Sequence, residues 1–181
     1  MGKLLKSISE EEFKDRVKIR FNNILDGLDL YSNGTLENKD TDESFENVES
    51  SFIGFFEDAL DLNEEVVIDF YIKKLDEESK VRLLKFLEGE DREILKRHID
   101  EIDNMKSVYF TLDSKELMRF ITRLNTKELF FCTVYFEKYE MTIWGNYKLS
   151  FPVFFKEESV LRKYEKIAKN NNLEIRGVVI R

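Results

Sequence analysis

The sequence predicts an α+β protein in which an acidic N-terminal helical module, residues 1–106, precedes a ferredoxin-like antiparallel sheet module with two helices, residues 107–181. Two observations support this division. Residues 1–106 contain 16 basic and 28 acidic residues, a net charge of −12, whereas residues 107–181 contain 13 and 9, a net charge of +4, and the whole chain carries −8. Apolar residues also recur at helical spacing in the first part, but alternate or form short runs in the second. The two modules are expected either to pack as one domain or to present opposite charges to different partners.

The first 60 residues predict two amphipathic helices joined by a loop. Ser9 and Glu12 form a capping box at the start of the first helix. Its apolar face continues at helical spacing through Phe13, Val17, Phe21, Ile24 and Leu28. Segment 31–42 is polar and contains an Asn-Gly turn signal, so it predicts a loop. A second helix is expected over residues 43–60, where phenylalanines and aliphatic residues line one broad face.

Segment 62–102 predicts three short helices, because a leucine followed closely by acidic residues recurs at Leu62, Leu75 and Leu87. Each copy is typical of a helix end that leads into the acidic N-cap of the next helix. Residues 66–72 are rich in β-branched and aromatic side chains, so a strand is the alternative for this stretch. We favour a helix there, because Asn63 supplies an N-cap and the neighbouring segments are helical.

The second half predicts a strand, a helix, an antiparallel meander, a helix and a final strand. The strands are expected at residues 108–112, 129–136, 141–144, 147–155 and 175–180, and the helices after a capping box at Asp113 and Glu116 and over residues 157–170. Pro152 lacks an amide hydrogen, so its strand is expected at a sheet edge or at a bulge. This order matches the split βαβ pattern, a fold that hosts many unrelated functions.

Composition limits the classes of function. A single cysteine, Cys132, excludes an internal disulfide and is typical of a reducing compartment, so we expect a cytoplasmic protein. No apolar run reaches the ~18 residues of a membrane span. His98 is the only histidine, and both it and Cys132 lie on predicted apolar faces, where packing is the commoner role. Glycine-rich phosphate-binding motifs are absent, so we expect no cofactor and favour a protein that is not an enzyme.

One segment resembles the calcium-binding loop of an EF-hand, because it lies between two predicted helices and carries oxygen-bearing side chains at suitable spacing. The candidate ligands are Asp29, Asn33, Thr35, Glu37 and Asp40. Tyr31 replaces a carboxylate at the third position, and Asp40 replaces the bidentate glutamate at the twelfth. Both departures weaken calcium binding, and a solvated turn is the competing interpretation.

The favoured functional hypothesis is a non-enzymatic regulator, adaptor or inhibitor that binds another protein, one of basic character, through an acidic helical surface. The candidate contact residues are carboxylates of the first module: Glu64, Glu65, Glu77, Glu78, Asp100 and Asp103. Small acidic inhibitors of basic toxins, such as immunity proteins, are similar in composition, but no family motif accompanies that similarity.

Two alternatives remain open. The first is an RNA- or small-ligand-binding sheet module, because RNA-recognition motifs stack bases on sheet aromatics. Its candidate residues are Phe131, Tyr135, Trp144, Tyr147 and Lys148. The signature of RNA-recognition strands is absent, so packing of these aromatics beneath the helical module is the favoured interpretation. The second alternative is a metal-dependent hydrolase that uses carboxylates, although no pair of acidic residues is marked for that role.

Overall fold

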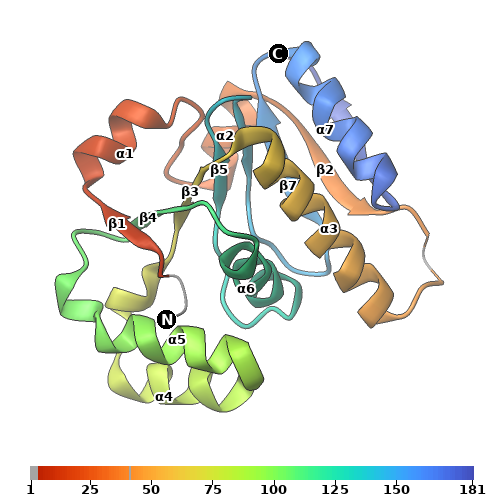
Figure 1. The fold of residues 1–181 in the computed structure, drawn as a ribbon. Coiled ribbons are helices and arrows are strands. Elements are labelled where there is room, and N and C mark those ends of the chain that lie inside the picture. The colour runs from red at the N-terminus through yellow and green to blue at the C-terminus, as the bar shows by residue number, and fades with distance from the viewer. Residues whose placement is uncertain (1–3, 41) are drawn as a thin grey trace.

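Eight antiparallel strands form one sheet in the computed structural model, which describes residues 4–40 and 42–181 (Figure 1). The strand order is β1-β4-β3-β5-β6-β7-β2-β8, so β1 and β8 are the two edges. The strands are β1 (Lys6–Ile8), β2 (Ser32–Asn38), β3 (Val66–Asp69), β4 (Tyr109–Leu112), β5 (Val134–Phe136), β6 (Met141–Ile143), β7 (Phe151–Phe155) and β8 (Leu173–Val179).

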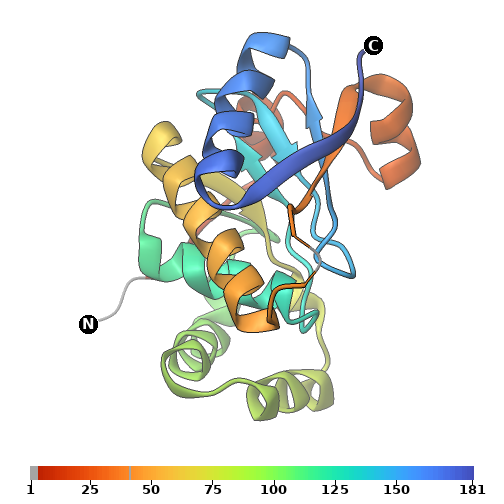
Figure 2. The same cartoon turned by 90° about the vertical axis from the view of Figure 1, so that its right-hand side faces the viewer.

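Seven α-helices accompany the sheet within the described residues. They are α1 (Glu10–Arg16), α2 (Ile24–Leu30), α3 (Phe45–Asn63), α4 (Glu77–Phe86), α5 (Gly89–Asp100), α6 (Lys115–Thr126) and α7 (Glu158–Asn170), with short 3-10 helices η1 (Tyr71–Lys74) and η2 (Ile102–Asn104). Figures 1 and 2 show α3, α6 and α7 on one face of the sheet, α2 on the opposite face, and α4 beside α5 at one end. None of the helices in this part of the chain is long and apolar enough to cross a lipid bilayer.

The alternation of side chains along the strands divides the core between the two faces of the sheet. Ile68, Phe110 and Val134 point toward α3 and α6 and belong to the main hydrophobic cluster. On the other face Val67 and Tyr135 pack with Phe13 of α1 in a second, much smaller cluster. That second face is therefore only partly covered, and the candidate site lies there.

Strands from both predicted modules alternate within the sheet. β3 lies between β4 and β5, and β2 lies between β7 and β8. The main cluster likewise combines side chains from residues before and after 106. The structure confirms a mixed fold of helices and an antiparallel sheet, but it does not confirm the ferredoxin-like arrangement, because the outer strands of the predicted split βαβ pattern are separated from the meander by strands of the first half.

The long first helix that the sequence predicts is interrupted. Ser9 caps α1 as expected, its hydroxyl accepting a hydrogen bond from the Glu12 amide at 3.1 Å. The helix ends at Arg16, and Val17 and Ile19 are then buried in the connection to α2, where the Ile19 carbonyl accepts a hydrogen bond from the Thr142 hydroxyl at 2.6 Å. Packing across the sheet thus overrides the local helical spacing.

Three further sequence predictions are wrong, and pairing with distant strands explains the first two. The loop predicted at residues 31–42 contains strand β2, which pairs on both sides with β7 and β8. The sequence favours a helix over residues 66–72, but this stretch forms strand β3, the alternative, followed by η1. β3 is a strand because it pairs with β4 on one side and with β5 on the other. The cap of α6 is Ser114, whose hydroxyl accepts from the Leu117 amide, and not Asp113.

Pro152 lies in an interior strand that pairs on both sides without a shift of register, whereas the sequence predicts a position at an edge or at a bulge. β7 pairs with β6 on one side and with β2 on the other. The Pro152 carbonyl accepts a hydrogen bond from the Trp144 amide at 2.9 Å, and Trp144 follows the end of β6. In an antiparallel pair the N–H and C=O of one residue face the same neighbour, so the missing amide hydrogen falls where the ladder with β6 has already ended.

Candidate functional site

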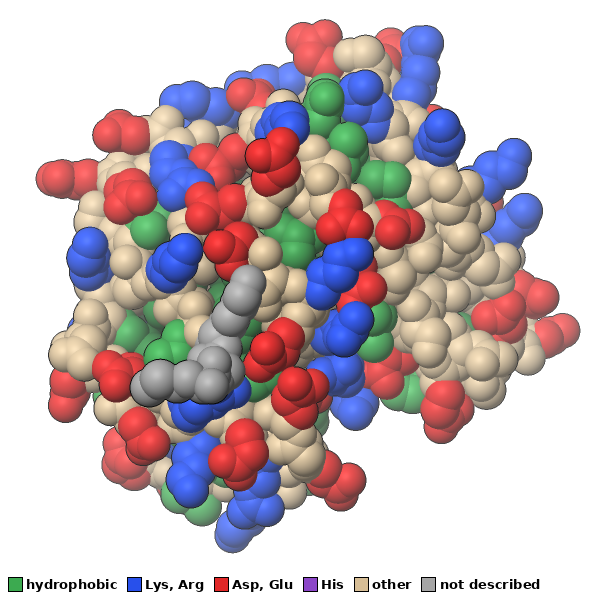
Figure 3. Space-filling view, in the orientation of Figure 1, with side chains coloured by type: hydrophobic (Ala, Val, Ile, Leu, Met, Phe, Trp, Pro, Cys, Tyr) green, Lys and Arg blue, Asp and Glu red, His purple; other side chains and the backbone are tan. Residues whose placement is uncertain are grey.

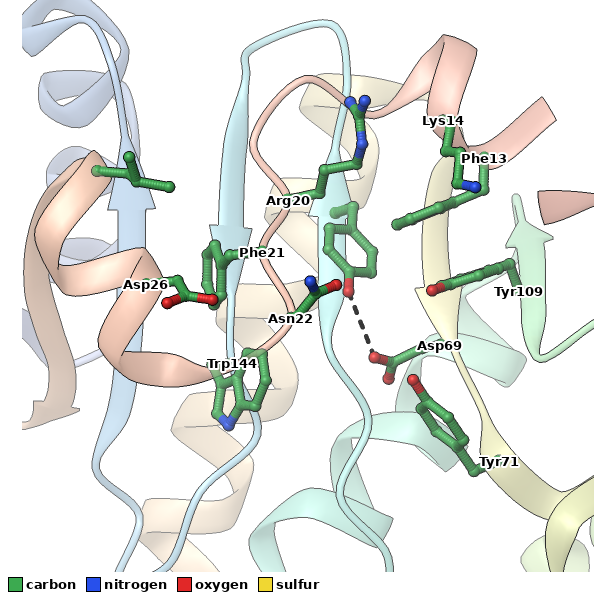
Figure 4. A pocket seen from close by; sticks show the side chains of 12 residues that line it. Phe13, Lys14, Arg20, Phe21, Asn22, Asp26, Asp69, Tyr71, Tyr109 and Trp144 are labelled. Atoms are coloured by element: carbon green, nitrogen blue, oxygen red, sulfur yellow. Dashed lines mark hydrogen bonds between the residues drawn. The ribbon is translucent and has the colours of Figure 1, made fainter. Parts of the chain in front are cut away.

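A cavity of about 410 Å³ lies on the partly covered face of the sheet, between α1, α2, the segment that joins them and the strands beneath (Figure 4). Its volume is within the range of small-molecule sites, roughly 300–1,000 Å³. Six aromatic side chains line it: Phe13, Phe21, Tyr71, Tyr109, Tyr135 and Trp144. Its principal polar side chains are Lys14, Arg20, Asn22, Asp26 and Asp69. We call this cavity the aromatic pocket.

The alternating direction of side chains along three neighbouring strands produces the floor of the aromatic pocket. In β3, Ile68 packs in the main core and Asp69 points to the other face of the sheet. Tyr109 of β4 and Tyr135 of β5 also point to that other face, although residues next to them in the chain pack in the main core. Because β4, β3 and β5 are adjacent in the sheet, Asp69 lies between the two tyrosines. Figure 4 shows its carboxylate among the hydroxyl ends of the tyrosine side chains.

Ring contacts hold the walls in place. Phe13 from α1 stacks on Tyr109 with a centroid distance of 3.6 Å and meets Tyr135 edge-on at 5.1 Å. At the other end, Phe21 stacks on Trp144 at 5.3 Å. Gly27 of α2 packs directly on Phe21, since a Cβ atom at Gly27 would lie 2.7 Å from that ring. The aromatic surfaces are thus supported by both short helices.

Asp69 is the most unusual group in the pocket. It is 7 % exposed, and its carboxylate accepts hydrogen bonds from the Thr133 amide at 2.6 Å and from the Tyr135 hydroxyl at 3.3 Å. Burial raises the pKa of Asp69 from its ordinary 3.8 to about 6, although both hydrogen bonds act in the opposite direction. No lysine or arginine in the described part of the chain forms an ion pair with it.

The three tyrosines of the pocket are protonated hydrogen-bond donors at neutral pH. Burial raises the pKa of Tyr109 to about 12 and holds that of Tyr135 well above its ordinary value, and the nearby negative charge of Asp69 acts in the same direction. Burial likewise raises the pKa of Tyr71, which hydrogen-bonds to Tyr109. None of these three hydroxyls is ionised at neutral pH, so none of them is prepared to act as a base.

An ion-pair cluster fastens α1, one wall of the pocket, to the body of the protein. The Arg16 guanidinium donates to both carboxylate oxygens of Glu137, at 2.9 and 2.8 Å, and to Glu65 at 2.6 Å. Its hydrogen bonds with Glu137 and Glu65 raise the pKa of Arg16, and the side chain is 27 % exposed. A bidentate pair with this degree of burial is stronger than an ordinary surface ion pair.

The structure separates the residues of the predicted aromatic platform. Tyr135 and Trp144 both line the aromatic pocket. Phe131 instead packs edge-on against Tyr147 at 4.6 Å, and Tyr147 is 60 % exposed. Lys148 lies beyond that pair in the same turn, with its backbone amide bonded to Glu128. Two of the five predicted residues are therefore part of the candidate site, and a continuous aromatic surface is not formed.

The six predicted carboxylates of the acidic surface do not gather at one place. Glu64 and Glu65 precede β3, whereas Glu77 and Glu78 follow it on α4, and Asp100 and Asp103 lie at the end of α5 and in η2. Figure 3 shows acidic and basic side chains interspersed over the face that it displays. Four of the six form ion pairs within the chain. These pairs are Glu64 with Lys138, Glu65 with Arg16, Glu77 with Lys80, and Glu78 with Arg82.

The segment proposed as a calcium loop is largely a strand. Asp29 lies in α2, while Asn33, Thr35 and Glu37 lie in β2 and Asp40 follows it. Alternate residues of a strand are roughly 6–7 Å apart, so these side chains do not surround one point as the ligands of an EF-hand do. Within residues 4–40 and 42–181, no group of three or more histidine, cysteine, aspartate or glutamate side chains is placed to hold a metal ion.

His98 and Cys132 lie in the packed interior, and neither lines the aromatic pocket. The Leu5 amide donates to Nε2 of His98 at 2.9 Å, and Nδ1 lies 2.7 Å from the Ile94 carbonyl. Burial lowers the pKa of His98, which is 1 % exposed, and raises that of the equally buried Cys132 thiol. His98 therefore joins the N-terminal segment to α5 as a neutral side chain.

Sequence reasoning does not identify Asp69, because it favours a helix over residues 66–72. The signal was present in the alternation of this stretch: Val67, Asp69 and Tyr71 occupy one set of positions, and Val66, Ile68 and Phe70 the other. A lone acidic residue in a strand that is otherwise apolar indicates a buried carboxylate, which proteins rarely keep without a partner or a role.

The chain matches no protein-family model, no curated protein and no solved structure. Proposals about its function therefore depend on the chemistry of the aromatic pocket.

Proposed function

We propose that this protein is a non-enzymatic binding protein and that its binding site is the aromatic pocket. The observation that supports this proposal is a carboxylate, Asp69, that is 7 % exposed at the floor of a cavity with aromatic walls and that forms no ion pair with any residue the structure describes. A buried ionisable group with a perturbed pKa in a concave site is a recognised indicator of function. This proposal develops the small-ligand alternative that the sequence suggested, with Tyr135 and Trp144 among the residues that would contact the ligand.

The other two functional hypotheses receive less support. A macromolecular partner on the acidic helical surface would meet carboxylates that are scattered and, at four of six positions, already paired with cations of this chain. A carboxylate-based hydrolase would need at least two acidic groups that converge. In the aromatic pocket Asp26 lies beside Phe21, at the opposite end from Asp69 (Figure 4).

The proposal is tested by screening a library of small molecules of mixed charge against the ¹⁵N-labelled protein. We expect amide shifts to concentrate at Asn22, Thr133 and Trp144, which line or adjoin the pocket. Asn22→Phe places a ring at an exposed position of the lining and should abolish these shifts. The matched control is Lys18→Phe, an equally exposed position nearby that does not line the cavity. Binding that maps elsewhere, or that survives Asn22→Phe, would contradict the proposal.

A further inference from the structure

We infer that the aromatic pocket selects an organic cation, an ammonium or guanidinium group carried on an apolar or planar body, with Asp69 as its counter-ion. This inference rests on the proposed function, since it specifies the ligand class of the same site. It follows from three features: the unused acceptor capacity of Asp69, the position of the chain's own cations, and the aromatic surfaces that surround the carboxylate.

The carboxylate of Asp69 has room for further donors. Two oxygen atoms together offer about four acceptor positions. The Thr133 amide occupies one position on Oδ1, and the Tyr135 hydroxyl occupies one on Oδ2 at the long distance of 3.3 Å. A charged donor would complete the set with the short, charge-assisted hydrogen bonds that ionised pairs form. It would also remove the main cost of keeping this carboxylate ionised in a buried position.

The two arginines near the pocket have other partners, and no lysine among the described residues forms an ion pair with Asp69. Arg20 donates to the Val17 carbonyl at 2.6 Å, and Figure 4 shows its guanidinium directed away from Asp69. Arg16 is held by Glu137 and Glu65. Lys14 is exposed at the rim, where water screens its charge. The cation that would neutralise Asp69 is therefore one that the chain does not itself supply within its described residues.

The aromatic surfaces favour a cation over a neutral or anionic group. Phe13 and Tyr109 cover one face of each other by stacking, whereas Tyr71 is 37 % exposed beside the carboxylate, and a ring face open to the pocket attracts cations electrostatically. Glu10 adds negative charge at this end. After burial, the charges of Asp69 and Glu10 are among the causes that raise the pKa of Tyr71 and of Tyr109. An anion would be repelled by Asp69, and a neutral group would leave the carboxylate uncompensated.

Trp144 makes the test direct, because it is the only tryptophan of the chain and lines the pocket. Titrations at pH 7.5, followed by Trp144 fluorescence and the Thr133 amide resonance, would use three probes of similar shape: 2-phenylethylammonium, neutral 2-phenylethanol and anionic 3-phenylpropanoate. We expect the cation to bind at least tenfold more tightly than either of the others. Because this comparison uses the unmodified protein, it does not depend on any variant folding.

Variants then identify the counter-ion. Asp69→Asn keeps an acceptor for Thr133 and should weaken binding of 2-phenylethylammonium tenfold or more, while leaving 2-phenylethanol within twofold. Asp15→Asn, the same change of charge at an exposed position of α1 outside the lining, should alter neither. Equal effects of Asp69→Asn on the cationic and neutral probes would overturn the assignment of Asp69.

The source of the cation is resolved by adding two capped amino acids, N-acetyl-lysine-N-methylamide and N-acetyl-arginine-N-methylamide. Tighter binding of either one than of 2-phenylethylammonium would indicate a basic side chain of a protein partner, and the reverse order a free amine; both results support the inference. If 2-phenylethanol or 3-phenylpropanoate binds as tightly as the cation, the inference fails while the proposed function stands. If no probe perturbs Trp144 or Thr133 at 10 mM, both are overturned.

Discussion

Asp69 should lower the stability of the folded protein at neutral pH, and replacing it with asparagine should remove that cost. The pKa of about 6 in the folded state, against the ordinary 3.8, means that the folded protein holds this proton more tightly than the unfolded chain. The unfolded chain therefore binds fewer protons between those two values, and stability falls as the pH rises from 3.8 to 6. Above pH 6 the full cost applies, about 3 kcal/mol at about 1.4 kcal/mol per pKa unit.

Asp69→Asn retains the geometry on which the comparison depends. Its amide oxygen can accept from the Thr133 amide, and its amide nitrogen faces the Tyr135 hydroxyl, which can rotate to accept. The free energy of unfolding of wild type and variant would be measured in urea at pH 4 and pH 7.5 by circular dichroism. We expect the stability of Asp69→Asn relative to wild type to rise by roughly 2–3 kcal/mol between pH 4 and pH 7.5.

Comparing the two proteins at each pH isolates Asp69 from the other titrating groups. The exposed control Asp15→Asn should change by less than about 0.5 kcal/mol over the same interval. A difference between wild type and Asp69→Asn that is the same at both pH values would refute the reasoning. So would an Asp69 carboxyl that titrates, by NMR, at the ordinary value of 3.8.

Three further predictions concern the surrounding structure. Burial lowers the pKa of His98 below its ordinary value of 6.5, so its contribution to stability is fully present above pH 6.5 and is lost as the pH falls toward the lowered pKa. His98→Gln should therefore flatten the dependence of the unfolding free energy on pH below 6.5. Arg16→Met leaves Glu137 unpaired and should cost about 1–2 kcal/mol in urea denaturation, with faster amide exchange in α1. Gly145→Ala should lower stability by about 1–3 kcal/mol, because its Cβ would lie 2.3 Å from Oδ1 of Asn125; an unchanged melting temperature would contradict that close contact.

Local signals in the sequence were sufficient for the elements whose formation depends on neighbours in the chain. The cap at Ser9, the helices α4 to α7 and the alternation that directs Tyr135 away from Val134 follow from spacing and side-chain chemistry. The failures occur where distant strands decide the conformation. Segment 31–42 has the composition of a turn. Asn33 and Thr35 are nevertheless strand residues, because β7 and β8 form backbone hydrogen bonds with this segment on both sides.

The candidate site depends on those same long-range pairings, which is why only part of it could be predicted. The sequence predicts Tyr135 and Trp144 as aromatic residues on a sheet face, but Asp69 joins them only because β3 lies between β4 and β5. No local pattern predicts this position of β3, because residues 66–69 pair with strands that lie 40 to 70 positions later in the chain. The charge asymmetry between the two halves likewise gave no indication that their strands alternate within one sheet.

The cost and the position of Asp69 together explain why this pocket is a better candidate than the acidic surface. Paired carboxylates such as Glu64 with Lys138 contribute locally to the fold and need no outside partner. The ionised Asp69 instead lowers the free energy of unfolding by an amount that is a large fraction of a small domain's net stability. A ligand that binds the ionised form would return part of that free energy, so the stability of the protein at neutral pH should rise with the concentration of its cation. That coupling between stability and ligand follows from an ionised carboxylate that has no counter-ion among residues 4–40 and 42–181.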